Sequence, residues 1–186
     1  MCSSDLSATC SGAGTSYKSP NGRHTTRALE TAWSFGGGGA SLWTTGPKWQ
    51  QGVTGINQPC LTPNATNPTA ACRAVPDVSA QSGDILTNGY SIVGSGGFGS
   101  GGGTSLSSPL WMGMWARVQG AAGHNLGFAA PLLYRVGGNA TTYARDFYDV
   151  TLGGNGIHVA TPGWDYTTGW GTPNVNGLIA DIAHKH

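Results

Sequence analysis

The chain has 186 residues, a formal net charge of +1 and an apolar fraction of 38%, so it is long enough for one domain, or part of one, with a real core. Charged residues make up only 9%, against about 25% in ordinary globular chains, so nothing points to nucleic acid or to an anionic membrane surface as a partner. The 32 glycines follow no triplet repeat and indicate tight turns rather than collagen, and no apolar run approaches the roughly 18 residues of a membrane span.

The first residues do not resemble a targeting signal. Residues 1–6 read Met-Cys-Ser-Ser-Asp-Leu and lack the charged-then-apolar pattern of a signal peptide. They match the translation of a common sequencing adapter with GTG taken as the start codon, so we expect residues 1–6 to be a non-native artefact. Residues 7–27 are rich in Ser, Gly and Thr and are predicted to form a loop-rich segment.

A short amphipathic piece at 27–35 and a strand at 40–45 are expected next, followed by a turn at 47–50 that buries Trp49. Cys60 and Cys72 then bracket a polar loop, and a disulfide closing such a loop contributes about 3 kcal/mol. Two reduced thiols or half a metal site are the alternatives, but no second Cys/His pair has zinc spacing, which favours the disulfide. Cys10 has no obvious partner.

The second half of the chain alternates strands with helices. Strands are expected at 74–80, 90–93 and 147–150, and helices at about 105–119, 129–136 and 175–183. The first helix is predicted from apolar residues at helical spacing: Leu106, Leu110, Trp111, Met114, Trp115 and Val118. This alternation predicts an α/β fold with a parallel sheet and flanking helices.

Ser105 is the candidate nucleophile. It follows a glycine-dense stretch, 94–103, and opens the first predicted helix, with Pro109 near the first turn. Free N–H groups and the positive dipole end at a helix start stabilise developing negative charge. The alternative interpretation is a serine that merely caps the helix after a flexible loop.

Asp149 and Asp165 are candidate metal ligands, because these two carboxylates bracket a glycine-rich turn. Hard cations such as Ca²⁺ bind carboxylate oxygens together with carbonyl oxygens of tightly turned backbone. The alternative is an aspartate that caps a turn.

Several motifs occur together in one order along residues 28–182, and this order resembles that of the sedolisins, the serine-carboxyl peptidases. These motifs are 30–33 (Glu-Thr-Ala-Trp), 47–50 (Pro-Lys-Trp-Gln), 75–80 (Val-Pro-Asp-Val-Ser-Ala), 102–105 (Gly-Gly-Thr-Ser) with Pro109, Asp149-Val150, 163–165 (Gly-Trp-Asp) and 168–171 (Thr-Gly-Trp-Gly). The resemblance implies that residues 28–186 are the C-terminal portion of a catalytic domain with a subtilisin-like parallel sheet. It also implies secretion, endopeptidase activity on protein substrates at acid pH, and a Ser-Glu-Asp triad in place of Ser-His-Asp.

The resemblance assigns roles to individual positions. Ser105 corresponds to the nucleophile, and one structural Ca²⁺ would be bound by the side chains of Asp149 and Asp165 and the carbonyls of Val150, Thr161 and Gly163. The family usually has glycine where Thr161 stands, which matters only if that position needs a positive φ.

The partners of the nucleophile are not found. In the family, a Glu with an Asp one helical turn later, and an oxyanion-hole Asp, all precede the serine. The only glutamate here is Glu30, which matches a non-catalytic family position and is followed four residues later by Ser34. We therefore expect the missing N-terminal half of the domain to supply these residues, and expect this chain alone to be inactive and to expose an unpaired sheet edge with apolar surface.

Two other functions are compatible with parts of the sequence. A Ser-His-Asp subtilase needs an Asp and a His before the serine, and only Asp5 and His24 lie in the relevant region, where His24 lacks the usual small-residue context. A non-enzymatic, calcium-binding secreted module is the other alternative. Asp77 is expected to be a structural carboxylate, Asp84 to lie near the substrate cleft, and the five histidines not to cluster.

Overall fold

The structure is a computed structural model that describes residues 16–18, 24–26, 30–61, 70–82 and 90–185. The expected artefact at 1–6, most of the loop-rich segment, Cys10 and Asp84 lie outside the described residues. Within them, no helix combines the length and the apolar character that a membrane span needs.

The described strands form four separate antiparallel pairs. The pairs are β1 (Ser16–Lys18) with β2 (His24–Thr26), β3 (Gly39–Thr45) with β4 (Cys72–Val75), β5 (Tyr90–Gly94) with β6 (Gly97–Gly101), and β7 (Phe147–Tyr148) with β8 (Thr172–Pro173). The predicted strands at 40–45, 90–93 and 147–150 are therefore present, the last one shorter than expected. Residues 27–29 fall outside the described part, and no helix forms over 30–35.

The predicted parallel sheet is not found among the described residues. Their one parallel contact is an isolated bridge between Ala32 and Gly153. The predicted strand at 74–80 stops at Val75, and the next residues bond to the chain near the C-terminus instead: Trp170 N donates to Asp77 O, and Ser79 N to Gly171 O, both at 3.0 Å. A strand is defined by its neighbours, and no described strand pairs with the other edge of 76–80.

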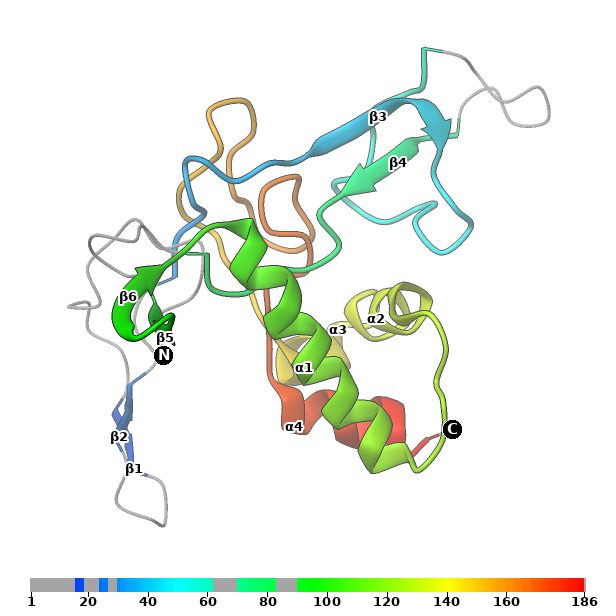
Figure 1. Cartoon of the computed structure of the whole chain (residues 1–186). Coiled ribbons are helices and arrows are strands. Elements are labelled where there is room, and N and C mark those ends of the chain that lie inside the picture. The colour runs from blue at the N-terminus through cyan, green and yellow to red at the C-terminus, as the bar shows by residue number, and fades with distance from the viewer. Residues whose placement is uncertain (1–15, 19–23, 27–29, 62–69, 83–89, 186) are drawn as a thin grey trace.

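The helices lie together (Figure 1) and contribute much of the hydrophobic core. They are α1 (Thr104–Ala122), α2 (Ala129–Gly137), α3 (Ala140–Asp146), α4 (Val175–Leu178) and the π-helical turn η1 (Ile179–Ala183). α1 packs across α4 and η1, and Val118, Leu178 and Ile182 are fully buried. The predicted helices are confirmed, and α1 runs three residues further than expected because Gly123, with φ 74°, supplies the left-handed cap.

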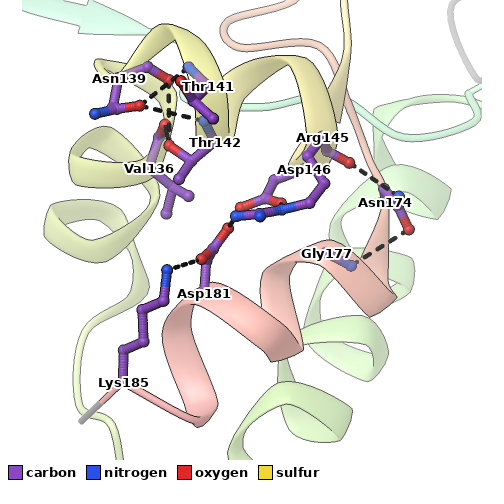
Figure 2. A network of polar contacts seen from close by, with 10 residues as sticks. All are labelled: Val136, Asn139, Thr141, Thr142, Arg145, Asp146, Asn174, Gly177, Asp181 and Lys185. Atoms are coloured by element: carbon purple, nitrogen blue, oxygen red, sulfur yellow. Dashed lines mark hydrogen bonds and ion pairs between the residues drawn. The ribbon is translucent and has the colours of Figure 1, made fainter.

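α3 was missed from the sequence, although its N-cap carries a local signature. The Asn139 side chain accepts from Thr141 N at 3.0 Å and Thr142 N at 3.2 Å. Figure 2 shows how the C-terminal end of the same helix is tied to η1: Asp181 pairs with both Arg145 and Lys185.

The β3–β4 hairpin extends away from the helices (Figure 1). The predicted Cys60–Cys72 disulfide is present at the end of this strand pair where Thr45 lies opposite Cys72, with the two Cys Cα atoms 5.0 Å apart. Gln50 joins this hairpin to the helical core: its side chain accepts from Ala74 N at 3.1 Å and donates to Tyr134 Oη at 2.6 Å. These contacts explain why the turn at 47–50 is part of the sequence pattern.

Candidate functional site

Ser105 lies in the first turn of α1 but does not cap it. The N-cap residue is Gly103, with φ 96° and no side-chain hydrogen bond to the helix. Ser105 itself is exposed, and its hydroxyl has no hydrogen-bond partner among the described residues. The interpretation of this serine as a cap is therefore wrong, and the hydroxyl is free to meet another group.

The start of α1 also leaves backbone donors free. The N–H groups of Leu106 and Ser107 both reach Gly103 O, at 2.9 and 3.4 Å. Those of Thr104 and Ser105 have no acceptor in the described part of the chain. Unpaired amides at the positive end of a 19-residue helix make this end favourable for negative charge next to the serine.

A cavity of about 310 Å³ adjoins this helix end. It is lined by the 76–80 segment, Ser82, Thr167, residues 36–37 and the face of α1 that carries Thr104 and Trp111. Ser105 is not among the lining residues, so its hydroxyl lies beside this cavity and not inside it. Ser79 is one of the lining residues, and its buried hydroxyl has no hydrogen-bond partner among the described residues.

The two predicted carboxylate ligands converge on one turn. Gly163 N donates to Asp149 Oδ2 at 2.8 Å, and Thr161 N donates to Asp165 Oδ2 at 3.1 Å. The 161–163 turn therefore sits between the carboxylates of Asp149 and Asp165. Hard oxygen atoms brought together around a tight turn are the donor set that Ca²⁺ takes.

The three predicted carbonyl ligands are also available. The carbonyl oxygens of Val150, Thr161 and Gly163 accept no hydrogen bond from any described residue. The backbone at position 161 does not require glycine, because the φ of Thr161 is not positive. Among the described non-glycine residues, only Ser95 has a positive φ, of 48°. The departure from the family pattern at Thr161 is thus compatible with a carbonyl ligand, and the residues present fit a calcium ion. No third His, Cys, Asp or Glu joins the two carboxylates within the described residues.

Tyr143 reports the negative potential of this region. Burial raises the pKa of the Tyr143 hydroxyl, and the nearby carboxylates of Asp149 and Asp165 raise it further. Both carboxylates therefore act on the same point, as expected if they lie close together. Tyr143 was not singled out from the sequence, because an isolated tyrosine in a helix carries no local signature of such a neighbourhood.

Asp165 also links the turn to the cavity beside Ser105. Its Oδ1 accepts from Thr167 N at 2.7 Å and Thr168 N at 2.8 Å, and it accepts from the Thr167 hydroxyl at 2.5 Å. Thr167, which the sequence analysis did not identify, lines the cavity together with Thr104. The carboxylate cluster and the start of α1 thus share one wall.

The glycines of the 168–171 motif are explained by close backbone contact. Gly169 has φ 61°, and a Cβ there would stand 2.3 Å from Asp77 C. A Cβ on Gly171, with φ 86°, would stand 2.1 Å from Tyr148 O. Only glycine lets this segment pack against both the 76–80 segment and β7.

The remaining candidates have structural contacts. Asp77 pairs with Arg73 at 2.7 Å, as expected of a structural carboxylate. The Glu30 carboxylate accepts a hydrogen bond from the Thr172 hydroxyl at 2.7 Å. This structural contact is consistent with the non-catalytic position that the resemblance assigns to Glu30. The ring of His158 stacks on Tyr166 with centroids 4.8 Å apart, and no histidine cluster forms among the described residues.

No family model matches the chain. Among characterised proteins it is similar to sedolisin from Pseudomonas sp. (strain 101), with 34% identity over 167 residues, covering 82% of this chain and 25% of the relative. It is also similar to kumamolisin from Bacillus sp. (strain MN-32), with 34% identity over 157 residues, covering 77% of this chain and 26% of the relative.

A solved structure agrees with these relatives. Pseudomonas sedolisin, a serine-carboxyl proteinase complexed with two molecules of pseudo-iodotyrostatin, matches with a TM-score of 0.67 and 30% identity, covering 94% of this chain and 45% of the solved chain. The chain is therefore a homologue of the sedolisin family of serine-carboxyl peptidases. It spans about a quarter of the length of the relatives named above.

Proposed function

We propose that this chain is the C-terminal part of the catalytic domain of a secreted serine-carboxyl endopeptidase that hydrolyses protein substrates at acid pH, with Ser105 as the nucleophile. The observation that carries the proposal is the exposed Ser105 hydroxyl, which has no partner in the described part of the chain and lies at a helix start without a side-chain cap, in a homologue of the sedolisins. The Cys60–Cys72 disulfide supports secretion, because such bonds persist in oxidising compartments.

In the proposed reaction, Ser105 Oγ attacks the carbonyl carbon of the scissile peptide bond while its proton passes to a carboxylate base. The tetrahedral intermediate expels the amine, which leaves with that proton, and an ester on Ser105 remains. Water then hydrolyses the ester and restores the hydroxyl. The free N–H groups of Thr104 and Ser105 lie at the dipole end that favours negative charge.

The base and the oxyanion-hole Asp would come from a complementary polypeptide, the N-terminal half of the same domain. An open edge supports this partner: Val78 N–H, Val78 C=O and Ala80 N–H have no hydrogen-bond partner among the described residues. These groups and the unpaired Ser79 hydroxyl border the cavity. An extended strand laid along this segment would satisfy the backbone groups and extend the sheet.

Apolar side chains near the nucleophile support the same partner. In the β5–β6 hairpin, which leads directly into α1, Val93 is 72% and Phe98 is 89% exposed. Apolar surface of this kind is normally covered by another part of the protein. The chain alone is expected to be inactive, since loss of the base from a serine peptidase triad costs about 10⁶ in kcat, as measured in subtilisin.

One Ca²⁺ would be held by the side chains of Asp149 and Asp165 and the carbonyls of Val150, Thr161 and Gly163. Such an ion would supply fixed positive charge between the Asp149 and Asp165 carboxylates, which carry like charge. Asp165 in turn positions Thr167 by accepting a hydrogen bond from its N–H, and Thr167 lines the cavity together with Thr104.

The proposal is tested in a single-chain hybrid, in which residues 28–186 replace the matching segment of the Pseudomonas sedolisin catalytic domain. The hybrid is expected to release peptides from an unfolded protein at about pH 4, and Ser105→Ala is expected to lower the rate by about 10⁵ or more. Ser100→Ala, an exposed serine in β6, is the matched control and is expected to keep full activity.

Two results would contradict the proposal. One is a Ser105→Ala hybrid that cleaves substrate as fast as the parent hybrid. The other is a folded parent hybrid, shown by cooperative unfolding, that has no peptidase activity.

A further inference from the structure

Ser82 bonds to the chain on both sides of the nucleophile. Its carbonyl accepts from Gly103 N at 2.5 Å, and its hydroxyl lies 2.7 Å from the hydroxyl of Ser107. Gly103 and Ser107 stand two residues before and two residues after Ser105. The Ser82 side chain is fully buried, so its place is fixed by packing.

The direction of these bonds follows from the donor count. Ser107 Oγ donates to Ala80 O at 2.9 Å, and a carbonyl oxygen can only accept. The single proton of the Ser107 hydroxyl is therefore used, so Ser82 Oγ must be the donor to Ser107. The hydroxyls form an ordered relay from Ser82 through Ser107 to Ala80.

The first turn of α1 needs such a tether. Gly103 provides no side-chain cap, and a glycine-rich strand, β6, precedes it. Helix ends without caps open easily. Trp111 Nε1 fixes the second turn by donating to Ser79 O at 2.7 Å, which leaves the turn that carries Ser105 to the Ser82–Ser107 pair.

We propose that the Ser82–Ser107 hydroxyl pair is a positioning clamp that holds Ser105 Oγ in its attack position. The proposal rests on the proposed function, because it assigns the clamp to that nucleophile. Serine hydroxyls do not titrate in acid, so the clamp keeps its geometry at a pH where a carboxylate tether would lose its charge. In this proposal both serines act through the backbone of α1.

The clamp is tested by kinetics in the single-chain hybrid. Misplacement of a nucleophile by about 1 Å costs about 10²-fold, so Ser107→Ala is expected to lower kcat by about 10- to 100-fold with KM changed by less than about twofold. Ser107→Thr retains the hydroxyl and is expected to restore kcat. The Ser82→Ala/Ser107→Ala double variant is expected to be no slower than the slower single variant. Both substitutions remove the same hydrogen bond, so their effects on kcat do not add.

Ser108→Ala is the matched control: this neighbouring serine is exposed and its hydroxyl makes no hydrogen bond within the described part of the chain. It is expected to keep the parent kcat. A merely structural role would lower the melting temperature of Ser107→Ala but leave kcat unchanged well below that temperature. Parent kcat in Ser107→Ala, or full additivity in the double variant, would overturn the clamp.

Hydrogen exchange in this chain by itself tests the clamp without any activity. In Ser107→Ala, the amides of Gly103 and Leu106 are expected to exchange at least about tenfold faster than in the parent, whereas Ser108→Ala leaves them unchanged. Unchanged exchange in Ser107→Ala overturns the clamp. An inactive parent hybrid in which Ser107→Ala still accelerates exchange speaks against the peptidase proposal alone.

Discussion

Replacement of Gln50 by leucine is expected to remove the polar link between β4 and the helical core. Gln50 is fully buried, donates to Tyr134 Oη at 2.6 Å and to Ala74 O at 2.8 Å, and accepts from Ala74 N at 3.1 Å. Leucine has a similar volume but no hydrogen-bonding group. Ala74 O keeps a second donor, the Arg73 guanidinium, and the Tyr134 hydroxyl keeps Asp77 as a partner, so the group left without a partner among the described residues is Ala74 N–H.

A buried polar group left unpaired costs about 1–3 kcal/mol, so a loss of about 1–3 kcal/mol is expected for Gln50→Leu. That is a measurable share of the roughly 5–15 kcal/mol by which a domain is stable. Urea unfolding followed by tryptophan fluorescence measures the free energy of unfolding, provided that the slope with denaturant is unchanged.

Gln51→Leu is the matched control for this experiment. Gln51 is only partly buried, and its side chain donates to Gly46 O at 2.7 Å and Ala71 O at 3.2 Å. Ala71 O retains the Gly46 N–H as a donor, so a loss of about 1 kcal/mol is expected. The reasoning is refuted if Gln50→Leu unfolds with the parent free energy, or if Gln51→Leu is the more damaging substitution.

Three further predictions concern pH, metal and backbone. Burial raises the pKa of Asp146, so the charged carboxylate destabilises the folded state above that pKa, and acidification removes this destabilisation. Asp146→Asn is therefore expected to raise the melting temperature more at about pH 7 than at about pH 4. An equal effect at both pH values would contradict this. Ca²⁺ at about 100 times its Kd is expected to add about 2.7 kcal/mol to the free energy of unfolding, and Asp149→Asn to lose most of that gain; a gain unaffected by the substitution, or matched by Mg²⁺, speaks against the assigned ligands. Gly169→Ala is expected to cost at least about 3 kcal/mol, because its Cβ would stand 2.3 Å from Asp77 C, whereas Gly156→Ala, at φ 88° in open space, is expected to cost about 1–2 kcal/mol; equal losses in urea would show that crowding is not the cause.

Helices and local closures could be predicted from the sequence because they depend on neighbours a few residues away. The apolar spacing from Leu106 to Val118 placed α1, and the polar loop between Cys60 and Cys72 favoured the disulfide. The spacing of Asp149 and Asp165 around a glycine turn was likewise enough to place both carboxylates on one turn, where Gly163 N and Thr161 N now meet them.

Strand partners could not be predicted in the same way, because a strand is completed by a segment distant in sequence. The 76–80 segment has the composition of a buried strand, yet among the described residues it finds backbone partners only at Trp170 and Gly171. The expected parallel sheet therefore did not appear there, even though the segment itself was correctly recognised as part of the family pattern.

The sequence by itself determined the family, the candidate nucleophile Ser105 and the two carboxylates, since each belongs to a short motif with its own spacing. Only the tertiary structure decided that Ser105 is not the helix N-cap, and that Ser82 forms hydrogen bonds with Gly103 and Ser107, on either side of Ser105. The physical reason is that a hydroxyl bond spanning 25 residues leaves no periodic trace in the sequence, whereas a helix repeats its pattern every few residues.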